Sequence, residues 1–256
     1  MEQKDKNLKS IWCDKYQVHS FEVDPFHRLG IVNLCHYFQE SAWNHAKHLG
    51  LGFSDLADKG KMWVLVKLGI QIDYLPQWNE KLELMTWSRG KRSLFALRDF
   101  EVYNSAKQKI IKGSSEWVIV NAKSHRPQRI DSIIDKIPVL PMKKCFNENI
   151  DTIEHIELED FCHKYQVCYS DLDFNGHVNN AKYIQWVLNT YSSEFHGEYV
   201  PFNIEANYRM EAEETQILEI RRKNIAPDCH IFSIRKENYQ QDLCRVLIRW
   251  KEKSKF

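Results

Sequence analysis

Residues 170–190, SDLDFNGHVNNAKYIQWVLNT, change from a polar loop into an apolar-faced helix, and the rest of the chain is best interpreted around them. The first part is rich in Asp, Asn and Gly, which favour turns and helix caps. Beyond residue 180 the apolar residues recur at three- and four-residue spacing, which places them on one face of a buried helix. They are Tyr183, Ile184, Val187, Leu188 and Tyr191. The stretch therefore predicts a polar site at the entrance of a buried helix.

Three side chains of this loop are candidates for chemistry. Asp173, Asn175 and His177 offer a carboxylate, an amide and an imidazole within five residues. Turn and cap formation explains the Asp and Asn residues but not His177, although a single histidine in such a place is often only a hydrogen-bonded polar residue. The trio suits acyl chemistry, because it can supply a base, a hydrogen-bond donor and an orienting group.

Composition and charge exclude several classes of protein. The net charge of +1 argues against a generally basic nucleic-acid binder. Seven cysteines, an odd number without a CxxC pair, favour the reducing cytoplasm, and we expect them to be buried thiols. The N-terminus is charged from its second residue and no apolar run is long enough to span a bilayer, so we expect neither a signal peptide nor a membrane span. Local basic clusters lie at Arg89, Lys91 and Arg92, at Lys143 and Lys144, and at Arg221, Arg222 and Lys223.

The first half predicts one helix among several strands. Residues 11–23 read as a strand, and an apolar stripe from Leu34 to Leu49 predicts a buried helix that Gly50 ends. Residues 63–74 alternate with a period of two, as in a half-buried strand, and further strands are expected at 81–88, 95–103 and 110–121. Short loops between consecutive strands favour an antiparallel sheet wrapped around the helix. His45 and His48 lack a metal-binding partner motif, so we interpret them as surface histidines.

The second half repeats this order. Proline-interrupted residues 122–160 predict a linker, and beyond it come a strand at 163–169, the polar loop, the helix, and strands near 202–211, 216–223, 230–237 and 242–251. When the two helices are aligned with His36 against Lys182, Leu29 and Ile31 occupy the places of Asn175 and His177. We therefore expect that the first half lacks the polar trio.

The motif D-x-N-x-H-V-N-N-x-x-Y-x-x-W, matched from Asp173 to Trp186, resembles the hallmark of the acyl-acyl carrier protein thioesterases, plant and bacterial enzymes that end fatty-acid synthesis. WVL at 63–65, LPQW at 75–78, TWSRG at 86–90 and RP at 126–127 are similar to the same family's pattern. The resemblance covers nearly the whole chain and implies an α+β double hotdog fold, in which each half is a curved antiparallel sheet around one helix. The implied domains are an N-terminal hotdog of residues 1–125 with the acyl-chain pocket, a linker of residues 126–160, and a C-terminal hotdog of residues 161–256 with the catalytic residues.

The family places an acidic residue on the strand after the second helix, and Glu211 stands there. Without the resemblance, Glu211 would read as one acidic residue of the solvated run EAEE. Plant members carry a cysteine directly after this glutamate, whereas this chain has Ala212, so attack by water is expected. Cys168 precedes the loop and is interpreted as a packing residue. The resemblance thus assigns catalysis to Asp173, Asn175, His177 and Glu211.

The implied activity is hydrolysis of a fatty acyl-acyl carrier protein thioester. Glu211 would deprotonate the water, Asn175 and His177 would stabilise the carbonyl oxygen or orient Glu211, and Asp173 would hold the loop. No metal or cofactor is expected, because no ligand pattern or nucleotide-binding fingerprint occurs. The implied partner is the acidic acyl carrier protein, which the basic clusters would face, and a homodimer is left open.

The apolar tail of the substrate is expected in the first half, against the helix of residues 33–49 and the strand of residues 63–74. Val64, Val66 and Leu68 are candidates for the floor of this pocket. Two alternatives remain, an acyl-CoA thioesterase and a non-catalytic acyl-binding hotdog protein. A hotdog dehydratase would be expected to carry its acid on the central helix, and residues 179–191 contain no Asp or Glu.

Overall fold

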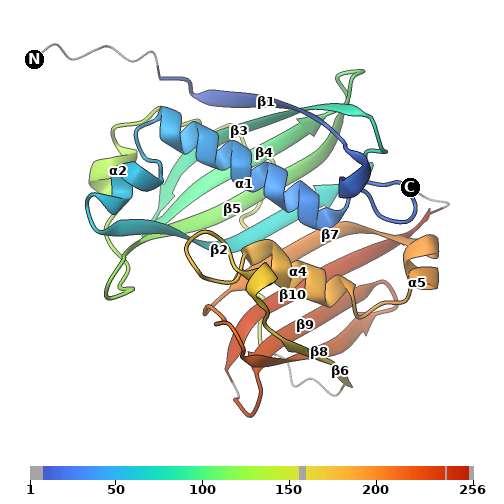
Figure 1. Ribbon diagram of the computed structural model, residues 1–256. Coiled ribbons are helices and arrows are strands. Elements are labelled where there is room, and N and C mark those ends of the chain that lie inside the picture. The colour runs from blue at the N-terminus through green and yellow to red at the C-terminus, as the bar shows by residue number, and fades with distance from the viewer. Residues whose placement is uncertain (1–7, 156–159, 240, 254–256) are drawn as a thin grey trace, which may run out of the picture.

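The same order of elements occurs twice along the chain in the computed structural model, which describes residues 8–155, 160–239 and 241–253 (Figure 1). The first half contains β1 (Ile11–Gln17), the 3-10 helix η1 (Ser20–Glu22), α1 (Ile31–His48), α2 (Phe53–Ala57), β2 (Lys61–Ile72), β3 (Lys81–Arg92), β4 (Phe95–Tyr103) and β5 (Lys109–Asn121). The second half contains β6 (Asp160–Gln166), the 3-10 helix η2 (Tyr169–Asp171), α4 (Asn180–Leu188), α5 (Ser193–Glu198), β7 (Tyr199–Tyr208), β8 (Ile217–Ala226), β9 (Cys229–Lys236) and β10 (Asp242–Glu252). A short helix, α3 (Asp131–Ile134), lies between the halves in sequence.

All these strands join one antiparallel sheet in the order β1-β3-β4-β5-β2-β7-β10-β9-β8-β6. In each half the first strand lies at the outer edge and the second strand lies beside the other half. The halves meet where β2 pairs with β7, with Gly69 opposite Glu205. α1 and α4 lie next to each other against the inner side of the curved sheet (Figure 1). The double hotdog expected from the sequence is therefore confirmed.

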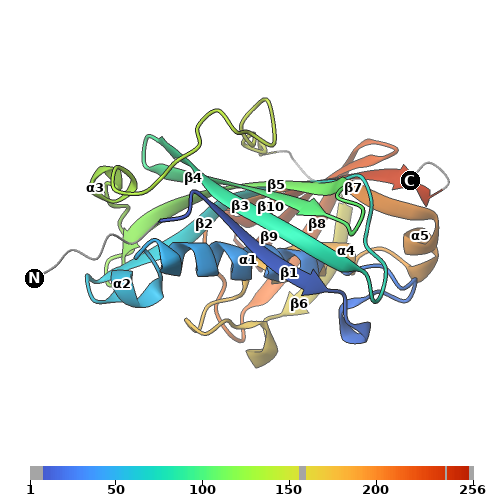
Figure 2. The same cartoon turned by 90° about the horizontal axis from the view of Figure 1, so that it is seen from above.

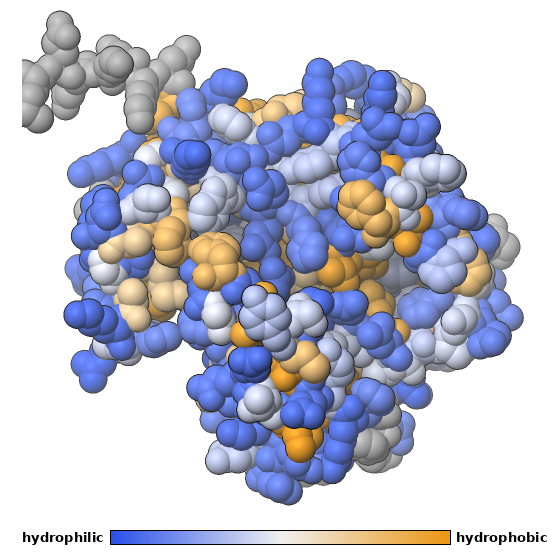
Figure 3. Space-filling model, viewed as in Figure 1, coloured by the Kyte–Doolittle hydropathy of each residue, from blue (hydrophilic) through white to orange (hydrophobic). Residues whose placement is uncertain are grey.

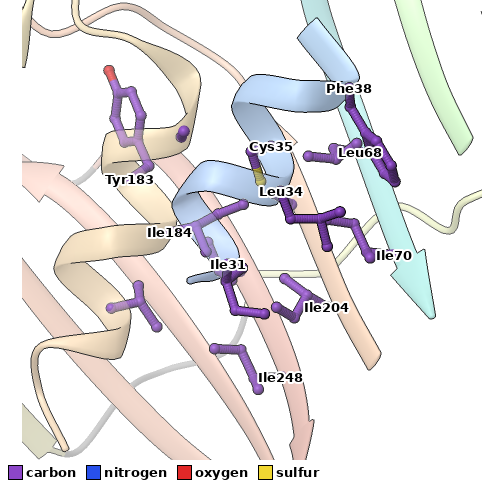
Figure 4. Close-up of a cluster of buried hydrophobic side chains, with 14 of the residues drawn as sticks. Ile31, Leu34, Cys35, Phe38, Leu68, Ile70, Tyr183, Ile184, Ile204 and Ile248 are labelled. Atoms are coloured by element: carbon purple, nitrogen blue, oxygen red, sulfur yellow. The ribbon is translucent and has the colours of Figure 1, made fainter. Parts of the chain in front are cut away.

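A continuous hydrophobic core fills the space between the two central helices and the sheet. Figure 4 shows Leu34 of α1 and Ile184 of α4 directed toward isoleucines of β2, β7 and β10. Phe38 stacks on Phe100 of β4, with ring centroids 4.4 Å apart. Its ring lies directly over Gly113 of β5, where a Cβ atom would come within 2.4 Å of Cε2. Burial of a ring of this size contributes roughly 1.5–3 kcal/mol.

A β-bulge interrupts the strict alternation predicted for residues 63–74. The pairing of β2 with β5 shifts between Leu65 and Lys67, so that Val66 is the extra residue. A bulge of one residue exchanges the two faces of a strand. Leu65 and Leu68 therefore both belong to the buried core, and the expected single face of Val64, Val66 and Leu68 is wrong.

The loops before the two helices correspond in a different register from the one predicted. Three features recur in the same order, namely the cap of the 3-10 helix, a bridge that closes the loop, and the N-cap of the central helix. They are His19, the Val23–Leu29 bridge and Gly30 in the first half, and Cys168, the Leu172–Val178 bridge and Asn179 in the second. The matching loop positions are Asp24 with Asp173, Phe26 with Asn175, and Arg28 with His177.

The expected match of Leu29 and Ile31 with the site residues is therefore wrong. The predicted alignment matches Tyr37-x-Gln39 with Tyr183-x-Gln185, and it is wrong by three residues. An error of less than one helical turn leaves the apolar faces of the two helices nearly superimposed. The first half nonetheless has neither the amide nor the imidazole at these places, and it has the carboxylate of Asp24.

The turns that follow β2 and β7 also correspond. Two successive N–H groups donate to one carbonyl oxygen at each strand end, and a residue with positive φ follows. After β2, the N–H groups of Asp73 and Tyr74 donate to Ile110, and Asn79 has a φ of 71°. After β7, the N–H groups of Arg209 and Met210 donate to Leu243, and Thr215 has a φ of 67°. Leu75 consequently takes the place of Glu211, and Pro76 takes the place of Ala212.

The segment between β5 and β6 crosses the face of the sheet opposite the helices, as Figure 2 shows for α3 and the loop that follows it. The Trp87 indole of β3 donates to the carbonyl oxygen of Lys143 (2.8 Å), and Ile150 lies against Gly69 of β2. The N–H of Ile153 donates to the side chain of Asn207 on β7 (2.8 Å). The segment thus contacts strands of both halves. In the part of the chain that the structure describes, no helix is long and apolar enough to cross a membrane.

Candidate active site

The polar loop of the second half is held by Asp173. The Asp173 N–H donates to the carbonyl oxygen of His177 (2.7 Å), and Oδ1 of Asp173 accepts from the N–H groups of Asn175 (2.8 Å) and His177 (3.4 Å). Gly176 has a φ of +80°, a backbone conformation that other residues rarely adopt. The Asn179 side chain then accepts from the Ala181 N–H (2.9 Å) and begins α4. Asp173 therefore fixes the backbone from which Asn175 and His177 project.

Glu211 meets this loop from the other side. β7 ends at Tyr208, three residues earlier than predicted, so Glu211 lies in the turn beyond the strand and Met210 is exposed rather than packed inward. Nδ1 of His177 lies 3.4 Å from Oε2 of Glu211, and the two side chains are 32% and 37% exposed. The structure thus brings the carboxylate and the imidazole together at a position that water reaches.

A cavity of about 680 Å³ opens at these residues and extends into the first half between α1 and strands β2, β4 and β5. Asp173, Asn175, His177 and Glu211 all contribute to its lining. Apolar side chains dominate the rest, including Ala42 and Leu49 of α1, Val64, Leu65 and Val66 of β2, Ala96 of β4 and Val118 of β5. The site is therefore polar at its mouth and apolar inside, as a pocket for a long hydrocarbon chain requires.

The predicted floor residues divide between two cavities. Val64 and Val66 line the large cavity, whereas Leu68 lines a separate cavity of about 30 Å³ beside Phe38. The bulge at Val66 separates these residues, because the strand turns its next side chains toward the core.

An aromatic cluster, Trp43, Phe53 and Phe174, rims the mouth. The Phe174 ring meets those of Trp43 and Phe53 edge-on, with centroids 5.4 and 5.3 Å apart, although Phe174 is 63% exposed. Figure 3 shows apolar surface of this kind scattered among polar side chains on the face that carries the helices. Sequence reasoning missed the cluster, because its members come from three elements.

His125 is a second residue that the sequence did not single out. It lies in the turn after β5 with a φ of 53°, lines the cavity, and places its ring edge-on to that of His177, with centroids 6.3 Å apart. The neighbouring Arg126 and Pro127 match the family's pattern, and this match was the sequence signal that could have pointed to His125.

His45 is buried between α1 and the sheet, so the interpretation of it as a surface residue is wrong. Its Nδ1 accepts from Nη1 of Arg98 (3.0 Å), and its Nε2 contacts the carbonyl oxygen of Lys9 (3.0 Å). Burial, together with the Arg98 charge, lowers the pKa of His45 to about 4. Burial also lowers the pKa of Arg98 to about 10. Arg98 lines the cavity and also donates to Thr86 (3.1 Å).

Thiols do not contribute to the cavity among the described residues. Ala212, directly after Glu211, is buried, and Cys168 is exposed rather than packed, with its Sγ donating to the carbonyl oxygen of Gln166 (3.2 Å). Cys13 is exposed as well, so the expectation that the cysteines are buried holds only for part of them. Cys168 lies outside the strand because β6 ends at Gln166.

The basic clusters proposed as a docking face are largely paired within the protein. Arg89 is buried beside Asp99 (3.1 Å), Arg92 pairs with Glu116 (2.7 Å), and Lys143 pairs with Glu101 (2.7 Å). A partner would have to compete with these carboxylates. The sequence cannot reveal such pairs, because their members come from different strands or from the crossing segment.

Comparison with known proteins assigns a family domain to each half of the chain. Residues 9–137 match the acyl-ACP thioesterase N-terminal domain, and residues 154–252 match the acyl-ACP thioesterase C-terminal domain. The chain belongs to the acyl-ACP thioesterase family. An acyl-[acyl-carrier-protein] hydrolase of Cuphea viscosissima is 28% identical over 225 residues, which cover 80% of this chain and 52% of that protein. An oleoyl-acyl carrier protein thioesterase of Arabidopsis thaliana is 29% identical over 224 residues, covering 80% and 61%.

The chain thus spans only about half to three fifths of the length of these chloroplastic relatives. Solved acyl-ACP thioesterase structures match it nearly from end to end. One from Bacteroides thetaiotaomicron has a TM-score of 0.85 at 24% identity and covers 98% of this chain and all of its own. A 12:0-ACP thioesterase from Umbellularia californica has a TM-score of 0.81 at 20% identity, with coverages of 96% and 98%. These structural likenesses establish the shared fold.

Proposed function

We propose that this member of the family hydrolyses the thioester of a fatty acyl-acyl carrier protein and releases the free fatty acid. The observation that carries the proposal is the pairing of His177 with Glu211, 3.4 Å apart, at the mouth of an apolar cavity of about 680 Å³. A carboxylate that water can reach is a suitable general base, and the cavity suits an acyl tail.

In the proposed reaction, Glu211 removes a proton from a water molecule whose oxygen attacks the thioester carbonyl carbon. The amide of Asn175 donates to the oxygen as negative charge develops on it, which is where fixed donors accelerate acyl transfer. The carbon–sulfur bond then breaks and the thiolate takes the proton back from Glu211. No stronger acid is needed, because a thiol has a pKa of about 8.5 and its anion leaves readily.

The other two residues support these groups. The Nδ1 of His177 faces the Glu211 carboxylate and orients it, while the loop geometry around Asp173 keeps Asn175 and His177 in place. The mechanism needs neither a thiol nor a cofactor.

The proposed partner is acyl carrier protein, which would present the thioester at the mouth while the tail enters the first half. Acyl-CoA thioesterase activity is the nearest alternative, since the same chemistry applies to a CoA thioester. A cytoplasmic location and a homodimer stay predictions.

The test is release of free fatty acid from acyl carrier protein and CoA thioesters of graded chain length. Glu211→Gln should lose about a hundredfold or more in kcat, the usual scale for removal of a general base. The exposed Glu214 supplies the control, since Glu214→Gln changes the same charge three residues away. Near-native activity of Glu211→Gln would contradict the assignment of the base. Failure of the wild type on every thioester would favour a non-catalytic acyl-binding protein.

A further inference from the structure

Tyr183 of α4 contacts the chain directly beside the proposed base. Its side chain is buried, and its hydroxyl oxygen accepts from the backbone N–H of Ala212 (2.9 Å). Figure 4 shows the ring projecting from α4 with the hydroxyl turned away from the isoleucine cluster. This hydrogen bond ties the turn after β7 to the central helix one residue from Glu211.

The turn needs such a contact, because Glu211 lies beyond the regular strand. Arg209 and Met210 still donate to the carbonyl oxygen of Leu243 in β10, at 2.9 and 3.2 Å. Ala212 is the residue after Glu211, and its N–H is held by a side chain of α4 instead of a neighbouring strand. The position of the Glu211 backbone is thus set by β10 on one side and by Tyr183 on the other.

The first half has a corresponding turn without this hydrogen bond. Both central helices are counted from their N-caps, Gly30 and Asn179, and this places Leu34 opposite Tyr183. In the turn, Pro76 stands opposite Ala212. The first half therefore lacks both the hydroxyl and the N–H at this contact, since proline has no backbone N–H.

This difference separates a requirement of the fold from a requirement of the site. In the first half the turn is held instead by backbone hydrogen bonds to the preceding loop, from the Leu29 N–H to Pro76 (2.7 Å) and from the Trp78 N–H to His27 (2.9 Å), so the fold can hold such a turn without a tyrosine hydroxyl. The donor and acceptor occur in the half where Glu211 replaces the buried Leu75. Burial raises the pKa of Tyr183, so its hydroxyl stays protonated and neutral throughout the physiological range.

We propose that Tyr183 is a positioning residue for Glu211: its hydroxyl holds the Ala212 backbone so that the Glu211 carboxylate stays beside His177 and the attacking water. The inference rests on the proposed role of Glu211 as general base. Tyr183 also contributes to the lining of the cavity, and the role proposed here is that of its hydroxyl, which accepts from the Ala212 N–H. Small displacements of a catalytic group are costly, since an error of about 1 Å can reduce the rate a hundredfold.

The first test is Tyr183→Phe, which removes the hydroxyl and keeps the ring. We expect kcat to fall tenfold or more, while KM stays within about twofold and the melting temperature changes little. Tyr37→Phe is the matched control, because that buried tyrosine of α1 donates to Glu22 outside the cavity. A near-native kcat of Tyr183→Phe would overturn the proposal, as would a loss of activity that only follows unfolding.

The second test removes the other partner. Ala212→Pro deletes the donor and copies the residue that the first half tolerates, so the variant should fold and lose as much kcat as Tyr183→Phe. The double variant should be no worse than either single one, because the same hydrogen bond is deleted. Losses that multiply in the double variant would contradict a shared contact.

A third measurement does not depend on activity. Hydrogen exchange of the Ala212 amide should be slow in the wild type and in Tyr37→Phe, and at least tenfold faster in Tyr183→Phe. If the wild type hydrolyses no thioester, the proposed function fails, and this exchange still reports whether Tyr183 holds the turn. Equal exchange in wild type and Tyr183→Phe would overturn the positioning role.

Discussion

The two loops that precede the central helices share one backbone and differ in what they do. In the first, the Asp24 N–H donates to the carbonyl oxygen of Arg28 (2.8 Å) and His27 has a φ of 63°. In the second, Asp173 and His177 make the same contact at 2.7 Å around Gly176, whose φ is 80°. The loop shape is thus a property of the fold, and the leading aspartate belongs to that shape.

The side chains give the loops opposite roles. Arg28 is buried, pairs with Asp24 (2.7 Å), and donates to the carbonyl oxygen of His196 in the second half (2.8 Å). His177, in the corresponding place, contacts Glu211 (3.4 Å) at the mouth of the cavity. One loop therefore holds the halves together, while the other lines the cavity. An acidic loop before a hotdog helix is consequently no sign of catalysis without the amide, the imidazole and a cavity.

The most severe way to break this division is to exchange the residues after β2 and β7. Glu211→Leu should lose about a hundredfold or more in kcat, as the general base is absent. Leu75→Glu should not restore activity, because Leu75 is 4% exposed and a buried unpaired carboxylate costs several kcal/mol. Thioester hydrolysis and thermal unfolding of both singles and the double variant measure this. Activity in the double variant would show that the first loop retains a usable site.

The halves also solve the packing between helix and sheet in different ways. Phe38 lies over Gly113 in the first half, and Val187 and Val246 occupy the corresponding places in the second. Gly113→Val should destabilise the protein by about 3 kcal/mol or more, since overpacking forces the ring or the strand to move. Adding Phe38→Val to it should recover part of this loss. Denaturant unfolding provides the free energies, and a harmless Gly113→Val would contradict the close ring contact.

Arg28→Met tests whether the hydrogen bond from Arg28 to His196 stabilises the contact between the halves. It should lower the free energy of unfolding by about 2 kcal/mol, less than for a fully buried ion pair, because Asp24 is 27% exposed. For a chain of this size, that corresponds to a fall of roughly 4–8 °C in melting temperature. His177→Ala is the counterpart, since it should reduce kcat and leave the melting temperature nearly unchanged. A reversal of these two effects would reverse the roles assigned to the loops.

The last effect is the pH dependence of the free energy of unfolding that arises from His45. It belongs to the first half, because α4 ends at Leu188 and has no residue that corresponds to His45. The pKa of His45 is lowered from 6.5 to about 4 on folding, so the unfolded chain binds the proton more tightly. The associated stability is present above pH 6.5 and is lost as the pH falls toward 4. Between pH 7 and 5 the loss is about 2 kcal/mol. His45→Gln should lack this part of the slope, and an unchanged slope would exclude His45 as its source.

Much of this molecule follows from local sequence. The spacing of Tyr183, Ile184 and Val187 predicts the second helix, and alternation predicts most strands within a few residues. The motif contains Asp173, Asn175 and His177, and the family resemblance adds Glu211. All four line one cavity.

Two of the failures involve partners that are distant in sequence. The bulge at Val66 depends on pairing with β5, and the burial of His45 depends on Arg98 of β4. The predicted register of the first loop is wrong because it rests on a short Tyr-x-Gln motif within the helices. The contacts that define the loop lie before the helices. A single chain shows propensities and periods, but it does not show which strand meets which.

The pairing of β2 with β7 has the symmetry of a dimer interface. Lys67 pairs with Asn207 and Gln71 pairs with Asn203, so each pair is the image of the other about a two-fold axis at Gly69 and Glu205. Such an isologous contact is the kind by which identical subunits close a two-fold assembly. A molecule made of one half could complete the same sheet with its own copy and would then carry two equal sites. Joining the halves in one chain removes that equality, so one loop can hold the two halves together while its half lines most of the single cavity.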